Sequence, residues 1–243
     1  MCVAWNHSGT LLASCGNDKK VRVWKKSDEA PFLECATKIG DSHSRAIRCV
    51  TFSHDGRYLA SAAFDSTVVI YERSETGEFE ETNKEEHNSE VKCCAFSRSG
   101  EFLATCCQDK SLWIWQSDDE DFSVSSILQP HTADIKHVAW HPHEDTAMYK
   151  VAESCCFQSR RIPVALYTVS WNSTTGLIAV GGGDGRVRIL RLEGDADDEA
   201  FVECATFSAF EGDVNSVSWH PSNSSLLTAA SDDGTIRLLQ VQI

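Results

Sequence analysis

The stretch VTFSHDGRYLASAAFDSTVVIY, residues 50–71, decides the fold. It runs from an aromatic residue, Phe52, through a polar turn with a glycine into an apolar run. An aspartate, Asp65, then precedes a second apolar run. Short runs that are rich in valine, isoleucine and aromatic residues, alternate with a period of two and are separated by turn residues indicate β-strands.

The same pattern recurs in residues 3–24, 94–115, 169–190 and 217–239. Each copy keeps the aspartate, and consecutive aspartates lie 47, 44, 75 and 49 residues apart. These aspartates are Asp18, Asp65, Asp109, Asp184 and Asp233. Repeats of about 40–45 residues with four strands each are typical of β-propellers. We therefore predict an all-β fold, a β-propeller that forms a single domain over residues 1–243.

One repeat unit is irregular. The 75-residue step between Asp109 and Asp184 is too long for one unit and too short for two. Residues 131–142 open a normal unit, but the pattern then breaks and resumes only at Trp171. We therefore expect an incomplete or irregular propeller with five recognisable blades plus a fragment. The predicted units are residues 1–37, 38–82, 83–127, 128–166 (the truncated one), 167–207 and 208–243.

A second set of residues recurs at fixed spacing. His43 precedes Asp65 by 22 residues, and His87 precedes Asp109 by the same distance. A serine or threonine lies four residues before each aspartate, and a tyrosine or tryptophan six residues after it. This arrangement resembles the WD-repeat family, in which such residues form a hydrogen-bonded network inside each blade. The implied structural networks are His43, Ser61, Asp65 and Tyr71 in the second unit, and His87, Thr105, Asp109 and Trp115 in the third.

Histidine, aspartate and serine could also form a hydrolase triad. A triad occurs once per active site, whereas this set recurs in successive repeats, which favours buried polar networks. The eleven cysteines show no Cys-x-x-Cys spacing, which zinc and redox sites commonly use. Adjacent cysteines such as Cys106 and Cys107 would point to opposite faces of a strand. We therefore predict no catalytic, cofactor-binding or metal-binding residues, and we assign no role to Cys155–Cys156.

Composition narrows the class of partner. The chain has 36 acidic and 22 basic residues and a net charge of −14, which argues against binding to nucleic acid. No apolar run is long enough to span a membrane, and the first residues do not resemble a secretion signal. We therefore expect protein partners, a cytoplasmic location, and the nucleus as a second location.

Sequence features that do not recur in every repeat indicate a more specific group within the WD-repeat family. Residues 102–142, FLATCCQDKSLWIWQSDDEDFSVSSILQPHTADIKHVAWHP, contain an acidic run between two strands. With AFEGDVNSVSWHP (residues 209–221) and LLTAASDDGTI (residues 226–236), they resemble the WD-repeat subunits of the cytosolic iron–sulfur protein assembly (CIA) targeting complex. The resemblance covers residues 2–142 and 167–240. Members of that family have seven blades, so it implies a shortened, truncated form that lacks parts of two blades.

The resemblance implies that the chain is not an enzyme. Members of this family act with a small acidic partner of the domain-of-unknown-function-59 family and with a HEAT-repeat adaptor. Together they pass iron–sulfur clusters to cytosolic and nuclear apoproteins. We therefore expect a non-catalytic interaction scaffold that helps deliver clusters. The repeat alone leaves an alternative open, a WD-repeat scaffold of another assembly such as a ubiquitin-ligase substrate receptor or an actin nucleator.

The loops that follow the histidines and precede the aspartates should lie at one end of the blades, where a rigid scaffold places binding residues. Among them, Phe64 stands where sister repeats have polar residues or glycine, and aromatic side chains anchor interfaces. Gln108 stands where the resembling family typically has arginine, which implies weaker docking here. The predicted protein-binding rim comprises Asn17, Ser44, Phe64, Asn88, Glu90, Gln108, Thr132, Asp134 and Asp232.

Overall fold

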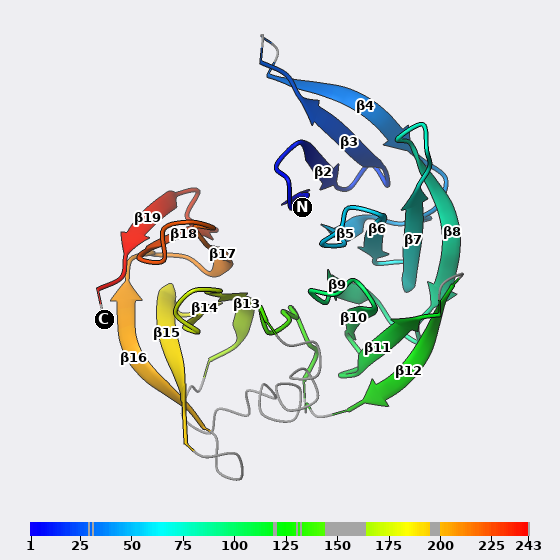
Figure 1. Ribbon diagram of the computed structural model, residues 1–243. Coiled ribbons are helices and arrows are strands. Elements are labelled where there is room, and N and C mark those ends of the chain that lie inside the picture. Colours follow the sequence, from blue (N-terminus) through cyan, green and yellow to red (C-terminus); the bar gives the residue numbers. More distant parts are fainter. Residues whose placement is uncertain are drawn as a thin grey trace. The chain divides into compact units, whose positions relative to one another are not determined.

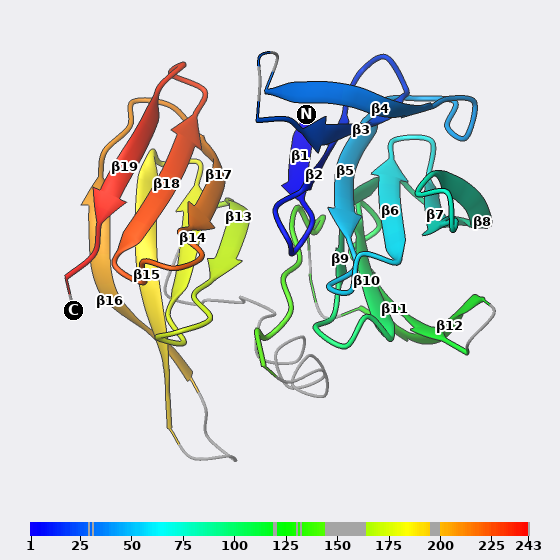
Figure 2. The same ribbon diagram turned by 45° about the horizontal axis from the view of Figure 1, so that its top comes forward.

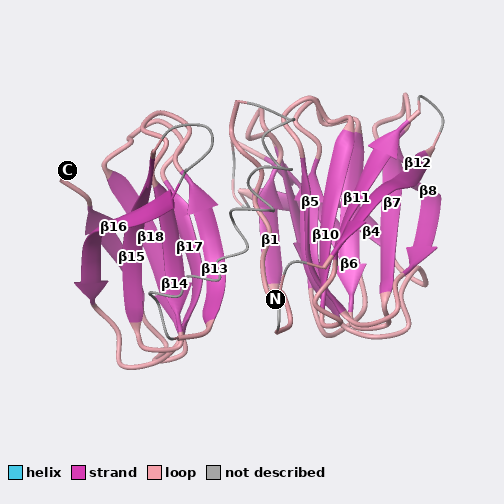
Figure 3. Cartoon of the chain, turned by 90° about the horizontal axis from the view of Figure 1, so that it is seen from below, coloured by secondary structure: helices cyan, strands magenta, loops and turns pink. Residues whose placement is uncertain are grey.

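The computed structural model describes residues 1–28, 30, 32–118, 121–129, 131, 133–143, 164–194 and 200–242. Every helix or strand among these residues is a β-strand (Figure 3), which confirms the all-β prediction. They include no helix that could cross a membrane. The chain divides into two compact units, Met1–Val138 and Ala139–Ile243.

The first unit contains three antiparallel sheets of four strands, each strand paired with its neighbours in the chain (Figure 1). Each sheet is one propeller blade. The first blade is β1 (Cys2–Trp5), β2 (Leu11–Cys15), β3 (Val21–Lys26) and β4 (Leu33–Ile39). The second blade is β5 (Ile47–Phe52), β6 (Tyr58–Ala63), β7 (Thr67–Arg73) and β8 (Phe79–Glu86). The third blade is β9 (Val91–Phe96), β10 (Phe102–Cys107), β11 (Leu112–Ser117) and β12 (Phe122–Leu128).

The described residues of the second unit form two further sheets. The fourth blade has four strands, β13 (Leu166–Trp171), β14 (Ile178–Gly182), β15 (Arg186–Glu193) and β16 (Ala200–Ser208). The fifth blade has three strands, β17 (Val214–Trp219), β18 (Leu226–Ser231) and β19 (Ile236–Gln240), with β19 at its edge (Figure 2). These five sheets confirm the five recognisable blades.

The fourth predicted repeat unit, residues 128–166, does not form a sheet of its own among the described residues. Residues 133–143 contain no strand, although their sequence resembles the first strand of a blade. Residues 144–163, including Cys155–Cys156, lie outside the described part of the chain.

A tight turn at the repeated aspartate joins the second and third strands of every blade. The residue after the aspartate has a positive φ in all five blades, 62° at Lys19, 69° at Ser66, 73° at Lys110, 70° at Gly185 and 80° at Gly234. Side chains other than glycine rarely adopt this conformation. In the second blade, Asp65 Oδ1 accepts hydrogen bonds from the N–H and the hydroxyl of Thr67, at 3.1 and 2.7 Å. The aspartate therefore stabilises the turn where no glycine is present.

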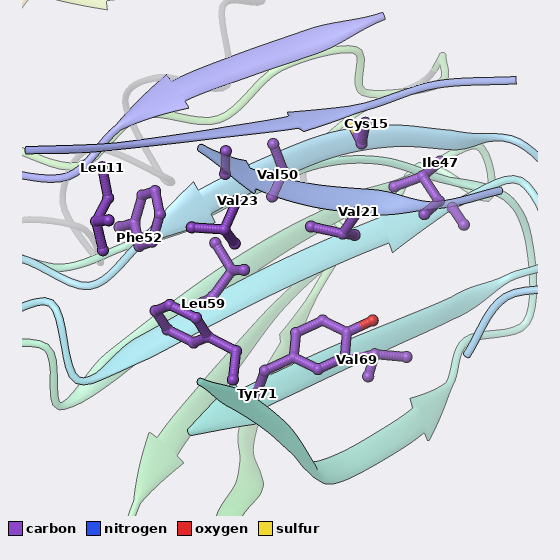
Figure 4. Packing of buried hydrophobic residues seen from close by; sticks show 13 residues of the cluster. Leu11, Cys15, Val21, Val23, Ile47, Val50, Phe52, Leu59, Val69 and Tyr71 are labelled. Atoms are coloured by element: carbon purple, nitrogen blue, oxygen red, sulfur yellow. The ribbon is translucent and has the colours of Figure 1, made fainter. Parts of the chain in front are cut away.

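Apolar side chains fill the space between neighbouring blades. In the first unit, Leu11, Val21 and Val23 of the first blade pack against Val50 and Phe52 of the second (Figure 4). The second unit repeats this packing. Its cluster contains Leu177, Ala179, Val187 and Ile189 of the fourth blade, and Val214, Val217, Trp219, Leu227 and Ala229 of the fifth.

Candidate interaction surface

A buried polar network ties the histidine loop of the second blade to its aspartate turn. His43 Nε2 lies 2.7 Å from Ser61 Oγ, which lies 3.3 Å from Tyr71 Oη. His43 Nδ1 lies 2.9 Å from Thr67 Oγ1 and 3.4 Å from Asp65 Oδ1. The structure thus brings together all four residues that the sequence assigned to this network.

The same network gives Asp65 a low pKa. Burial raises the pKa of this carboxyl, but hydrogen bonds from Thr67 and from the N–H of Ser44 outweigh burial and bring it to about 2. Burial also lowers the pKa of His43, which Asp65 only partly opposes. Asp65 is therefore ionised and serves as an acceptor that fixes the loop.

The third blade repeats the network with one difference. His87 Nε2 lies 3.1 Å from Thr105 Oγ1, which accepts a 2.8 Å hydrogen bond from Trp115 Nε1. The other ring nitrogen, Nδ1, lies 3.0 Å from Cys107 Sγ. The sequence predicted that Asp109 would join this network, and it did not predict Cys107 as a member.

Asp109 instead stabilises its own turn. Its Oδ1 accepts hydrogen bonds from the N–H and the hydroxyl of Ser111, at 2.9 and 2.5 Å. Burial brings the pKa of His87 down to about 4, with Asp109 opposing it through its charge. His87 is therefore neutral at physiological pH and well placed to hold the loop.

In three blades, a backbone hydrogen bond joins the loop before the first strand to the aspartate turn. Phe64 N donates to Ala46 O, and Gln108 N donates to Glu90 O, both at 3.0 Å. In the second unit, Asp232 N donates to Asp213 O, also at 3.0 Å. Residues that flank the histidines and aspartates are thus brought to the same end of each blade.

The clearest feature at this end of the first unit is a cluster of Phe64, Arg45, Lys92 and Glu90. Lys92 Nζ lies 4.5 Å and Arg45 Cζ 5.9 Å from the centroid of the Phe64 ring. Both cations also reach Glu90, Lys92 at 2.5 Å and Arg45 at 2.9 Å. Arg45 donates in addition to the carbonyl oxygen of Phe64. We call these four residues the Phe64 cluster.

The Phe64 cluster spans the second and third blades and is fixed by its own charges. The hydrogen bond from Lys92, supported by Arg45, holds the pKa of Glu90 below its usual value. A cation over an aromatic face adds attraction. The sequence predicted Phe64 and Glu90 as rim residues but not Arg45 and Lys92, which follow the histidines by two and five residues.

Other predicted rim residues lie beside this cluster. Gln108 is exposed and accepts a 3.3 Å hydrogen bond from Ser89 Oγ, and Asn88 is exposed next to it. Ser44 is exposed and donates from its N–H to Asp65 Oδ2 at 2.6 Å. Asp134 is paired with Lys136.

The remaining predicted rim residues are not part of this group. Asn17 is exposed at the turn of the first blade. Asp232 lies in the second unit, where its carboxylate accepts a hydrogen bond from Asn215 at 2.5 Å. Thr132 lies outside the described residues.

The cysteines of the first unit lie closer together than strand alternation suggested. Cys49 of β5 and Cys93 of β9 come from adjacent blades, and their sulfur atoms lie 3.7 Å apart. Both are buried, and the interaction with Cys106, followed by burial, raises the pKa of the Cys93 thiol. Among the described residues, no group of three or more histidines, cysteines or acids could hold a metal ion.

Comparison with known proteins agrees with this geometry. The WD40 family (WD domain, G-beta repeat) matches residues 1–25, 34–72, 80–116 and 201–239. The crystal structure of the mitotic checkpoint complex contains a chain with a TM-score of 0.79 and 16% identity, covering 99% of this chain and 74% of that chain. At this identity, the likeness shows the fold alone.

Two curated relatives from two animals are both described as cytosolic iron-sulfur protein assembly proteins. A protein of Caenorhabditis elegans, "Probable cytosolic iron-sulfur protein assembly protein CIAO1 homolog", is 42% identical over 316 residues, which include 98% of this chain and 93% of that protein. "Probable cytosolic iron-sulfur protein assembly protein Ciao1" of Anopheles gambiae is 42% identical over 78 residues, 31% of this chain and 23% of that protein. Since the nematode alignment takes in nearly all of both chains, this chain belongs to the WD40 family and, within it, to the cytosolic iron–sulfur protein assembly proteins called CIAO1.

Proposed function

We propose that this chain is a non-catalytic interaction scaffold of the cytosolic iron–sulfur protein assembly machinery, and that it helps deliver clusters to cytosolic and nuclear apoproteins. The observation that carries the proposal is the 42% identity to the nematode CIAO1 homologue across 98% of the chain. A WD40 propeller supplies rigid blades with loops at their ends, and such loops commonly carry binding residues.

The polar networks support a scaffold without catalysis. His43 and His87 are buried, and burial lowers the pKa of each. A general base must reach its substrate and needs a pKa near the working pH. Both histidines are used to hold loops, so these loops can present fixed surfaces to partners.

We propose that partners bind at the rim that the sequence predicted, and that the Phe64 cluster is the main contact in the first unit. Phe64 offers an aromatic surface, while Arg45 and Lys92 add positive charge to a chain whose net charge is −14. An acidic partner surface would therefore be attracted to this place. The proposed rim residues are Asn17, Ser44, Phe64, Asn88, Glu90, Gln108, Thr132, Asp134 and Asp232.

The family resemblance names the partners to test. They are the small acidic protein of the domain-of-unknown-function-59 family, the HEAT-repeat adaptor and iron–sulfur apoproteins. We propose that they meet the chain in the cytoplasm and also in the nucleus, without nucleic acid or membrane.

The proposal is tested by binding of the purified acidic partner and adaptor to the tagged chain, to Phe64→Ala and to Gln108→Arg. We expect Phe64→Ala to weaken binding at least tenfold, as for an interface anchor, and Gln108→Arg to strengthen it. Glu75→Ala is the matched control. Glu75 is exposed in the loop between β7 and β8, at the far end of β7 from the rim. A folded chain that binds neither partner, with or without Gln108→Arg, contradicts the proposal.

A further inference from the structure

We propose that Cys49 and Cys93 are a redox-active pair that hydrogen peroxide converts to a reversible disulfide between the second and third blades. Cys49 lies in β5 and Cys93 in β9, the first strands of these two blades. The inference goes beyond the proposed function, because it concerns the contact between two blades and needs no partner protein.

The two cysteines hold the same position in successive repeats. Cys49 lies three residues before Phe52, the last residue of β5, and Cys93 lies three residues before Phe96, the last residue of β9. β5 and β9 contact each other and lie side by side in two views (Figures 1 and 2). Since each repeat packs on its neighbour, the equivalent residues meet, although they are 44 residues apart in the chain.

The two thiols are already close to the arrangement that a disulfide needs. Their sulfur atoms are 3.7 Å apart, and the exposed fractions are 8% for Cys49 and 3% for Cys93. A disulfide bond is about 2.05 Å long, so each sulfur atom has to move by less than about 1 Å. Small side-chain rotations therefore suffice, and the strands can stay in place.

Two other thiols compete for Cys49. Cys2 and Cys94 also interact with its side chain. Cys94 follows Cys93 in the same strand, where adjacent side chains point to opposite faces, and its sulfur lies 3.9 Å from the carbonyl oxygen of Ala60. The sulfur of Cys93 contacts that of Cys49 in hydrogen-bonding geometry. We therefore expect the bond between Cys49 and Cys93 to be the main product.

Oxidation of the pair consumes one molecule of hydrogen peroxide. The thiolate of one cysteine attacks a peroxide oxygen, the O–O bond breaks, hydroxide leaves, and the sulfur becomes a sulfenic acid. The thiolate of the second cysteine attacks this sulfur, the S–O bond breaks, hydroxide leaves, and the disulfide forms. The two thiol protons convert the two hydroxides to water. Two sulfur atoms are thus oxidised, and the two peroxide oxygens are reduced.

Burial slows this reaction but does not change its selectivity. The interaction with Cys106, followed by burial, raises the pKa of the Cys93 thiol, and the thiolate is the reactive form. The disulfide should therefore form more slowly than the oxidation of the exposed Cys35 and Cys204. Its selectivity comes from the short distance between the two sulfur atoms.

The disulfide would link the two blades that carry the Phe64 cluster. A bond between residues 44 apart in the chain restricts the unfolded state, and for a chain of this size it should raise the melting temperature by about 4–16 °C. Disulfides in the cytosol are usually transient, so a dithiol reductant should return the melting temperature to its starting value.

The test is peptide mapping of the full chain after treatment with hydrogen peroxide. The peroxide is removed with catalase, the remaining thiols are blocked with N-ethylmaleimide in denaturant, and the monomer is digested without reduction. Trypsin cleaves after lysine and arginine, so it releases residues 49–57 and 93–98 as separate peptides. We expect mass spectrometry to find these two peptides joined, fragmentation to place the bond at Cys93, and dithiothreitol to separate them.

Matched variants and an unfolded control identify the pair. Cys93→Ser should abolish both the joined peptides and the rise in melting temperature, whereas Cys94→Ser, in the same strand and equally buried, should keep both. The same treatment in urea should lose the preference for this pair, because the sulfur atoms are then no longer held together. Fragmentation that places the bond at Cys94 or Cys2 would overturn the proposal without any variant. So would an unlinked monomer in which Cys35 and Cys204 are already oxidised, or equal yields in the folded and unfolded chain.

Discussion

The replacement Thr105→Val tests whether the buried network of the third blade is structural. Valine keeps the shape of threonine but removes the hydroxyl that accepts from Trp115 Nε1 and contacts His87 Nε2. Thr105, Trp115 and His87 are all buried, with exposed fractions of 0, 1 and 3%. The replacement therefore leaves two buried polar groups without this partner.

The expected loss of stability follows from that burial. A buried donor or acceptor left without a partner costs about 1–3 kcal/mol. Two such groups give a decrease of about 2–6 kcal/mol in the free energy of unfolding. For a chain of this size, each kcal/mol lowers the melting temperature by about 2–4 °C. We therefore expect a drop of about 4–24 °C in the melting temperature, measured by thermal unfolding followed by circular dichroism.

The first blade provides the matched control. Trp24 Nε1 donates to Ser14 Oγ at 2.9 Å, the same type of bond, but both residues are only half-buried. Water can replace the hydroxyl there, so Ser14→Ala should cost less than about 1 kcal/mol. Equal losses for the two variants, or a loss below about 1 kcal/mol for Thr105→Val, would refute the reasoning.

Four further predictions concern titration (two of them), backbone conformation and thiol reactivity. The pKa of Asp65 is about 2, below its unfolded value. Its contribution to stability is therefore present above about pH 4 and is lost as pH falls through 2. In acid unfolding, Asp65→Asn should lose less stability than the wild type between these two pH values. His87 has a pKa of about 4, also below its unfolded value, so stability should fall as pH drops from about 6.5 to 4, and an NMR titration should give a midpoint near 4. In urea unfolding, Gly185→Ala should destabilise the chain by about 2–4 kcal/mol, because the new Cβ would lie 2.3 Å from Phe210 O at a residue with φ +70°. Gly234→Ala is the control. Gly234 has φ +80° but open space around the new Cβ, so its replacement should cost only about 1–2 kcal/mol. At pH 7.5, iodoacetamide should alkylate the exposed Cys35 and Cys204 and leave the buried Cys93 and Cys94 intact by mass spectrometry, since both buried thiols have raised pKa values.

The repeated aspartate made the blades predictable from the sequence. Its fixed distance from the apolar runs places a turn between the same two strands each time, and the positive φ after Asp65 and its counterparts follows from that turn. The networks were predictable for the same reason. Recurrence at constant spacing locates residues in space even when they are far apart in the chain, as His43 and Ser61 are.

The sequence was less informative about contacts between blades. Cys49 and Cys93 lie in different repeats, and no spacing within one repeat shows that their sulfur atoms meet. Arg45 and Lys92 gather around Phe64 because two loops from successive blades approach each other. The role of Cys107 was missed because Asp109 fits the repeat pattern equally well, and only the side-chain positions distinguish the two.

The irregular repeat unit need not disturb the proposed binding rim, because blades depend on their nearest neighbours. The nematode alignment runs over 316 residues, more than the 243 of this chain, so that relative has residues that this chain lacks. In repeat architectures each unit contacts mainly the adjacent units. The cluster around Val50 joins only the first and second blades, and the Phe64 cluster only the second and third. A variant that restored the relative's extra residues should therefore leave the Phe64→Ala effect on partner binding unchanged. If the effect of Phe64→Ala on partner binding changes when these residues are restored, the rim depends on blades beyond its nearest neighbours.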